Sequence, residues 1–369
     1  MVVQARVSAF TNAFGAVLEE AAARGASDIH FEPLPGVLRI RIRVHGVLEV
    51  LREVRDTARA VRLMEVVKAS CGFDVGKRGV PQDARFATDA PPLDYRAALV
   101  PLLEGESIVL RLLERERAFD LEAYPLRADA KTDLRRALRK RDGLIVVSGP
   151  TGSGKSTLLY NALGSLDRDR LKVATIEDPV EYRLEGVAQS PVDRARGASF
   201  AGLLRAFMRA DPDVILVGEV RDEETAEAAM HAASTGHLVL TTVHANTARE
   251  VQDRLSGLGV DPELYRANLR FASAQRLVPR LCEGCRVDDP EGRAELEDLV
   301  GYDGRAYRST GCELCAHTGV AGRALLFEWI DRQVGDTGAP KLVAKGGLQA
   351  EALQAVNEGV IDAVAARGF

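Results

Sequence analysis

The chain has 369 residues, room for two or three domains of ordinary size, and its 46% hydrophobic content supports packed cores. A net charge of −5 and an aromatic content of 5% disfavour nucleic-acid binding, because such proteins need a basic face and stacking aromatic rings. No apolar run approaches the length of a membrane span, and the first residues lack a signal-peptide pattern. We therefore expect a cytoplasmic protein with no nucleic-acid partner and only peripheral membrane contact.

The first 117 residues show the pattern of a small α+β domain. Apolar residues at helical spacing predict a helix over Phe10–Ala23. Alternation with arginines predicts a half-buried strand over Val37–Val44, which the His45-Gly46 turn reverses into Val47–Leu51. A helix, a loop and two further strands are expected at Thr57–Cys71, Gly76–Phe86, Tyr95–Val100 and Ser107–Leu113, and the domain should end near Arg117.

Helical and buried-strand patterns alternate in the second part of the chain, after an expected linker over residues 118–130 that includes Pro125. This alternation predicts an α/β domain over 131–369, with a parallel sheet covered on both faces and functional residues at the carboxyl ends of its strands. The expected helices are 133–141, the segment after Ser156, Phe200–Ala210 and Glu223–Ser234, and the expected strands are Leu144–Val147, Lys172–Glu177, Val214–Val217 and His237–Thr242.

The C-terminal part of this domain has a different pattern. We expect a cysteine-bearing module over residues 281–330 and a helical tail over 339–369, with a helix at Ala350–Ala366.

A glycine-rich segment directly follows the Leu144 strand and fits the phosphate-binding pattern G-x-x-x-x-G-K-[ST]. Its glycines let backbone N–H groups face the phosphates of ATP, Lys155 supplies a mobile positive charge, and the Ser156 hydroxyl is suited to Mg²⁺. The expected nucleotide-binding set is Gly149, Pro150, Thr151, Gly152, Ser153, Gly154, Lys155, Ser156 and Thr157.

Acidic residues follow two of the other expected strands. Glu219 comes after Val214–Val217, as in a Walker B element, and Asp178 and Glu181 come after Lys172–Glu177. Acids at such positions hold Mg²⁺ or orient the attacking water. The sequence leaves open which acid takes which role.

His244 follows the strand His237–Thr242 and is placed to contact the γ-phosphate or respond to its loss. A lone histidine is more often a structural residue, and the position of His244 relative to the phosphate loop is what favours a functional role.

Four of the five cysteines form two C-x-x-C pairs, with 26 residues between the pairs. Four thiolates in this pattern favour a structural zinc ion in a tetrahedral site. An iron–sulfur cluster and oxidised pairs are the less favoured alternatives. The expected ligands are Cys282, Cys285, Cys312 and Cys315, whereas Cys71 is expected to be a small buried hydrophobe.

Taken together, these motifs resemble the secretion-superfamily hexameric ATPases that drive type II secretion and type IV pilus assembly. The resemblance runs from about Ser27 to Ile330 and includes the tetracysteine module. The matching segments are Ala26–Pro33, Gly105–Arg111, Ile176–Glu181 (the Asp box), Asp211–Asp222 (the Walker B region), Thr235–His244 (the His box), Gln275–Val278 and Gly319–Arg323.

The resemblance implies a RecA-like ATPase domain, a PAS-like N-terminal module and a homohexameric ring, in which that module packs on the next subunit's ATPase domain. It implies that Arg96 and Arg111 reach the nucleotide phosphates, as arginine fingers do, and that Arg276 has a nucleotide role. ATP turnover would then displace an inner-membrane platform protein, with the motor held peripherally at that membrane.

The chain begins close to the family's second N-terminal module, so we expect the additional N-terminal domain to be absent. The His box continues with Ala245, where the family more often has threonine.

The sequence therefore predicts a Mg²⁺-dependent ATPase motor for pilus or pseudopilus assembly. One alternative is a RecA-like DNA translocase or repair ATPase with a zinc ribbon, which requires DNA-stimulated turnover. The other is a nucleotide-switched assembly scaffold, which binds ATP and forms rings with negligible hydrolysis.

Overall fold

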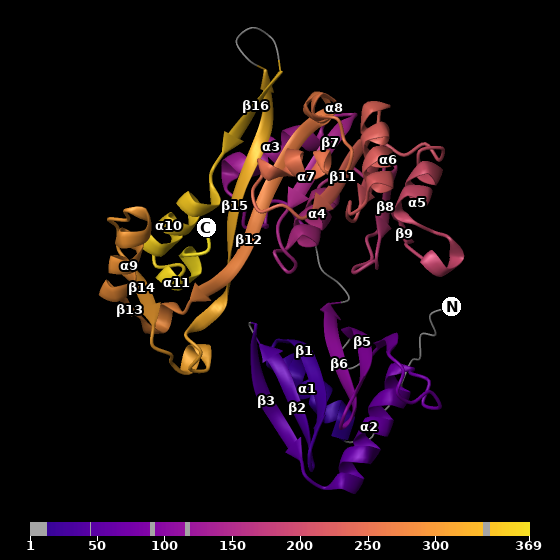
Figure 1. Ribbon diagram of the computed structural model, residues 1–369, viewed down its shortest axis with the longest axis vertical. Helices are drawn as coiled ribbons and strands as arrows, with labels where there is room; N and C mark the ends of the chain where they lie inside the picture. The colour runs from indigo at the N-terminus through magenta and orange to yellow at the C-terminus, as the bar shows by residue number, and fades with distance from the viewer. Residues whose placement is uncertain (1–12, 45, 89–92, 115–118, 335–339) are drawn as a thin grey trace. The chain divides into compact units, whose positions relative to one another are not determined.

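The structure, a computed structural model, describes residues 13–44, 46–88, 93–114, 119–334 and 340–369 (Figure 1). The chain divides into two compact units, Met1–Arg117 and Ala118–Phe369. Residues 10–12 of the first expected helix and His45 of the expected turn lie outside the described residues.

In its described residues, the first unit is an antiparallel sheet of six strands with two helices. The strand order is β3-β2-β1-β6-β5-β4, so the chain builds two three-stranded halves that join where β1 pairs with β6. The helices are α1 (Ala13–Ala23) and α2 (Thr57–Cys71), and the strands are β1 (Ala26–Leu34), β2 (Val37–Val44), β3 (Val47–Val54), β4 (Gln82–Ala87), β5 (Leu93–Leu102) and β6 (Gly105–Glu114).

One face of this sheet packs on the helices. Ile40 and Ile42 of β2 are fully buried with Phe14 of α1, whereas the intervening arginines are partly exposed, as the alternating pattern predicts. Cys71 is buried in this core, and burial raises the pKa of its thiol, which confirms its expected role as a small hydrophobe.

Two strands of the first unit are absent from the sequence prediction. The segment Ala26–Leu34 forms the central strand β1, although polar residues alternate with its apolar ones and Pro33 lies near its end. The expected loop Gly76–Phe86 ends in the strand β4, a short edge strand next to β5 in which Phe86 is the one buried residue. Tertiary pairing therefore overrides weak local propensity at both places.

The second unit is built on an eight-stranded sheet, which confirms the predicted α/β class. Its order is β16-β15-β12-β7-β11-β10-β8-β9. The six strands from β12 to β9 run parallel to one another, whereas β15 pairs antiparallel with β12 and β16 pairs antiparallel with β15. The strands are β7 (Gly143–Ser148), β8 (Val173–Glu177), β9 (Val187–Pro191), β10 (Val214–Val217), β11 (Leu238–Val243), β12 (Leu269–Leu281), β15 (Val320–Val334) and β16 (Pro340–Lys345).

Helices cover both faces of this sheet (Figure 1). Within β7, Leu144 and Val146 pack in the cluster that contains α5 and α6, whereas Ile145 and Val147 pack in the cluster that contains α3 and α4. Burial on both faces explains the uninterrupted apolar run of the strand. The helices are α3 (Ala128–Leu138), α4 (Lys155–Gly164), α5 (Phe200–Phe207), α6 (Glu223–Ser234), α7 (Glu250–Ser256) and α8 (Pro262–Asn268).

The segment before α3 packs on the second unit, although the sequence predicts a linker there. Leu121, Tyr124 and Leu126 are buried in the same cluster as α3 and α4, and α3 begins at Ala128. The short, irregular spacing of these residues gives no periodic signal.

The C-terminal region differs from the prediction in two ways. Strands β12 and β15 are long partners in the main sheet, so the residues that flank the cysteines belong to that sheet. The expected helical tail begins instead with β16, which pairs with β15, and its helices are the separate α10 (Leu348–Asn357) and α11 (Ala363–Ala366). The remaining elements are β13 (Arg286–Asp288), α9 (Pro290–Val300) and β14 (Tyr307–Ser309).

A buried ionic cluster ties α3 to the antiparallel edge of the sheet. Asp133 is 4% exposed and accepts hydrogen bonds from Trp329 Nε1 at 2.9 Å and from Lys345 Nζ at 2.6 Å. Arg136 bridges Asp133 and the buried Asp331. Burial raises the pKa of Asp133, but the Lys345 and Trp329 donors outweigh this effect and hold it below its usual range.

We expect Asp133→Asn to lower the free energy of unfolding by about 2 kcal/mol, because it removes one of the two buried carboxylates, Asp133 and Asp331, that pair with Lys345 and Arg136. Urea denaturation at pH 7 measures the loss, and Lys140→Ala at a nearby exposed position is the control. Because the pKa of Asp133 is lowered by folding, its contribution is present above the unfolded value and is lost as the pH falls through the folded one. The difference in unfolding free energy between the native protein and Asp133→Asn should therefore shrink below a pH of about 4. Equal stability of variant and native protein at pH 7 would contradict this account.

Candidate nucleotide-binding site and cysteine cluster

The phosphate-loop motif connects β7 to α4 and requires glycine at its first position. Gly149 has a φ of 143°, and a Cβ atom there would lie 2.5 Å from the carbonyl oxygen of Gln275 on β12. Gly152 and Gly154 also have positive φ values, of 78° and 86°. The loop thus turns beside a neighbouring strand, and the helix that follows begins at Lys155.

Lys155 is held in the loop by backbone carbonyls. Its Nζ donates to the oxygens of Gly149 and Pro150, both at 2.9 Å. Burial lowers the pKa of Lys155, nearby Glu219 opposes this effect, and nearby Arg276 adds to it. The predicted phosphate-binding lysine is therefore close to both an acid and an arginine that were predicted separately.

Glu219 lies just beyond the end of β10. Its carboxylate forms an ion pair with Arg221 at 2.7 Å. The preceding Gly218 is bonded to strands on both sides. Its N–H donates to the Ile176 carbonyl of β8 at 2.8 Å, and its own carbonyl accepts from Thr242 Oγ1 of β11 at 2.8 Å. These bonds hold the turn that carries Glu219 against the neighbouring strands.

His244 lies beyond the end of β11, next to the phosphate loop. Burial and the charge of Lys155 lower the pKa of His244, whereas Glu219 and a backbone hydrogen bond with Gly149 raise it. The net lowering keeps the imidazole neutral at pH 7. A hollow in the surface separates this histidine from α7 and is lined by Gly149, Pro150, His244, Glu250, Asp253 and Arg254.

Arg276 and Gln275 extend along β12 past the end of β7. Arg276 donates to the Asn246 carbonyl at 3.0 Å, and burial lowers the pKa of its guanidinium. Gln275 is buried and donates from Nε2 to the Ser153 carbonyl at 2.6 Å, a contact with the phosphate loop that sequence reasoning missed. In the sequence, Gln275 shows only as a polar residue within an apolar strand. The parallel pairing of β12 with β7, which brings it to the phosphate loop, is visible only in the structure.

The structure brings most of the predicted nucleotide-site residues together. Lys155, Glu219 and His244 lie at the carboxyl ends of the adjacent strands β7, β10 and β11, with Arg276 alongside on β12. The hydroxyl-bearing Ser156 is exposed in the first turn of α4, and Thr157 follows it.

The second acidic pair lies farther along the same edge. Asp178 and Glu181 follow β8, which is next to β10 and on the side away from β7, and both are exposed.

Arg96 and Arg111 belong to the first compact unit. They lie directly opposite each other on β5 and β6. Arg111 Nε donates to the buried Asp28 of β1 at 2.9 Å, and Arg96 lies 3.8 Å from Asp83 of β4. The two predicted arginine fingers are therefore neighbours on the face of the antiparallel sheet opposite its helix-covered core.

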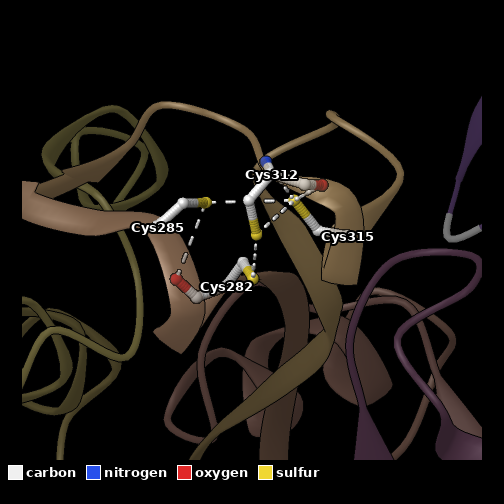
Figure 2. A group of neighbouring side chains, drawn as sticks. All are labelled: Cys282, Cys285, Cys312 and Cys315. Atoms are coloured by element: carbon white, nitrogen blue, oxygen red, sulfur yellow. Dashed lines mark hydrogen bonds between the residues drawn. The ribbon is translucent and has the colours of Figure 1, made fainter.

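The four paired cysteines converge, as Figure 2 shows. All are free thiols, and their sulfur atoms lie within 4.8 Å of one another. The Cys282–Cys312, Cys285–Cys315 and Cys312–Cys315 sulfur pairs are 3.8, 3.9 and 3.8 Å apart. Sulfurs of a tetrahedral zinc site with Zn–S bonds of ~2.3 Å lie about 3.8 Å apart, so the cluster can hold a metal ion of this kind.

The backbone favours the thiolate at Cys315, whereas burial raises the pKa of Cys282 to about 11. The N–H groups of Cys312 and Gly319 both donate to the sulfur of Cys315 at 3.2 Å. Burial raises the pKa of Cys315, but these donors outweigh it and lower the pKa to about 6. Thiolate is the form in which cysteine binds a metal.

A parallel sheet with a phosphate loop after one strand, and acids and a histidine after neighbouring strands, defines the P-loop class of α/β proteins. Within this class, residues 4–355 match the family model described as Type II/IV secretion system protein. The chain belongs to this family.

Curated relatives include type II secretion system proteins. The chain is 40% identical over 322 residues to the type II secretion system protein E of Aeromonas hydrophila, an alignment that covers 85% of this chain and 64% of the relative. It is 40% identical to the type II secretion system ATPase E of Vibrio cholerae, covering 85% and 63%, respectively. It is 39% identical to the protein transport protein HofB homolog of Escherichia coli, covering 84% and 68%. The chain thus spans somewhat less than two thirds of the length of the first two.

Solved structures share the fold. The Legionella pneumophila ATPase DotB aligns over 100% of this chain and 98% of its own, with a TM-score of 0.70 and 21% identity. The pilus retraction motor PilT with bound ADP aligns over 95% of both chains, with a TM-score of 0.65 and 23% identity. Among the described residues, no helix combines the length and apolarity required to cross a bilayer.

We expect the purified protein to contain about one zinc ion per chain and Cys312→Ser to contain none, because three thiolates do not complete a closed tetrahedral site. Elemental analysis of the untagged protein measures the metal, and a lower melting temperature of the variant should accompany its loss. Cys71→Ala is the control, since Cys71 lies in the core of the first unit. Iron in place of zinc, or an unchanged metal content in Cys312→Ser, would contradict this expectation.

Proposed function

We propose that the chain is the ATP-hydrolysing motor of a machine that assembles a pilus or pseudopilus, of the type II secretion, type IV pilus or competence kind. The observation that carries the proposal is the convergence of Lys155, Glu219, His244 and Arg276 at one edge of the sheet. Membership of the Type II/IV secretion system family and the names of the curated relatives support it.

In this mechanism the phosphate loop binds ATP, and Lys155 leaves its carbonyl partners to contact the β- and γ-phosphates. Ser156 and one acid would hold Mg²⁺, which neutralises charge that develops on the phosphates. Glu181 or Glu219 orients the attacking water, and neutral His244 donates to or senses the γ-phosphate.

The assembly we propose is a homohexamer in the cytoplasm, held peripherally at the inner membrane by a platform protein of the machine. The PAS-like N-terminal module of one subunit would bring Arg96 and Arg111 to the nucleotide of the next, which makes hydrolysis depend on the ring's conformation. The cysteine cluster would hold a structural zinc ion that shapes the C-terminal module.

The decisive experiment measures ATP hydrolysis and solution mass of the purified chain with Mg²⁺. We expect nucleotide-dependent hexamers with slow turnover that DNA does not change, and a decrease of about 100-fold or more in Lys155→Ala, because this variant lacks the charge that meets the phosphates. Turnover that requires DNA would favour a DNA translocase. Tight ATP binding and rings without hydrolysis would favour an assembly scaffold.

Arg96→Ala and Arg111→Ala should each lower kcat by about tenfold or more if their guanidinium groups stabilise charge in the transition state. Steady-state hydrolysis by the hexamer measures the effect. Arg62→Ala, at an exposed position on α2 of the same unit, is the control. Unchanged turnover in both test variants would rule out the arginine-finger role.

A further inference from the structure

A buried carboxylate lies at the end of β8, immediately before the exposed acids Asp178 and Glu181. Glu177 is 5% exposed and accepts three hydrogen bonds from neutral donors. Thr175 Oγ1 donates at 2.6 Å, Gln189 Nε2 at 3.1 Å, and the third donor is the Tyr160 hydroxyl. Such donors replace the water that a buried carboxylate loses.

Gln189, on β9, uses its whole amide group in this cluster. Its Nε2 donates to Glu177 and also to the Tyr182 carbonyl at 2.9 Å, and its Oε1 accepts from the Leu184 N–H at 2.7 Å. A glutamine has two N–H donors and one carbonyl acceptor, so the three contacts define one amide orientation. Gln189 therefore holds the backbone of Tyr182, which directly follows Glu181, and that of Leu184.

Tyr160 connects the same cluster to the phosphate loop. It lies on α4, the helix that begins at Lys155, and its ring packs edge-on against Tyr182 at a centroid distance of 5.7 Å. Burial and the charge of Glu177 raise the pKa of the Tyr160 hydroxyl, so it stays a proton donor. The helix that carries the phosphate-binding lysine and the segment that carries Glu181 thus share one buried anchor.

We infer that Gln189, anchored on Glu177, is a positioning residue that holds the 178–184 segment, and with it Glu181, at the nucleotide-binding edge of the sheet. The inference rests on the proposed ATPase function for its catalytic consequence. Its structural part, the restraint of residues 182–184, is independent of that function. Neither Gln189 nor Glu177 touches the nucleotide in this mechanism; both act through the backbone that follows Glu181.

The test uses Gln189→Glu, which keeps the size of the side chain but removes both N–H donors. A carboxylate next to Glu177 has a raised pKa, because two like charges repel each other in a buried site. When protonated, the new side chain donates one O–H to Glu177 and still accepts from Leu184. We therefore expect kcat at pH 8 to fall about tenfold or more, with KM for ATP changed by less than about threefold, and kcat to recover toward the native value near pH 6.

Gln189→Leu, which cannot regain a donor, should be slow at every pH. Gln349→Glu, at an exposed position of α10, is the matched control and should behave as the native chain. A native-like kcat of Gln189→Glu across the pH range, or a loss that appears in KM alone, would overturn the inference.

A second readout does not depend on catalysis. The bond after Arg183 is a trypsin site, and the Tyr182 carbonyl just before it loses its Gln189 Nε2 donor in Gln189→Glu. At pH 8, limited trypsin digestion followed by mass spectrometry should show cleavage after Arg183 several-fold faster in Gln189→Glu than in the native chain or Gln349→Glu. An unchanged cleavage rate refutes the restraint. Faster cleavage in a chain whose native form hydrolyses no ATP supports the restraint and refutes the proposed function instead.

Discussion

The candidate nucleotide site depends on the parallel pairing of β7 with β11 on one side and β12 on the other. This pairing sends three chain segments to the same edge of the sheet, where the phosphate loop, His244 and Arg276 meet. It also places the β12 backbone against the start of the loop, where only glycine leaves enough room. A Cβ at this position would displace either the strand or the loop.

Two buried acids strengthen this framework in the same physical way. Asp133 joins α3 to the antiparallel strands at one edge of the sheet, and Glu177 joins α4 and β9 to the end of β8 near the other. Each acid accepts hydrogen bonds from other elements, and these bonds replace the water that a buried carboxylate loses. The acid on β8 differs in that its partner Gln189 also restrains the segment after Glu181.

The cysteine cluster follows from strand pairing as well. Cys282 comes directly after β12, and Cys312 and Cys315 come shortly before β15. Because β12 and β15 are antiparallel, the end of one strand meets the start of the other, and the two C-x-x-C pairs come together. The main sheet therefore holds both the candidate nucleotide site and the cysteine cluster, at different positions along β12.

The sequence by itself determined the features whose chemistry is local: the phosphate loop after a buried strand, the acids and histidine after other strands, the paired cysteines and the α/β class. Each shows as a motif or a hydrophobic period within a few residues. Only the tertiary structure decided that Gln275 supports the phosphate loop, that Gln189 and Tyr160 meet on Glu177, and that residues 340–345 form a strand. These features depend on contacts between segments that are distant in the chain. A single amide or a short edge strand has no periodic sequence pattern from which its partner could be predicted.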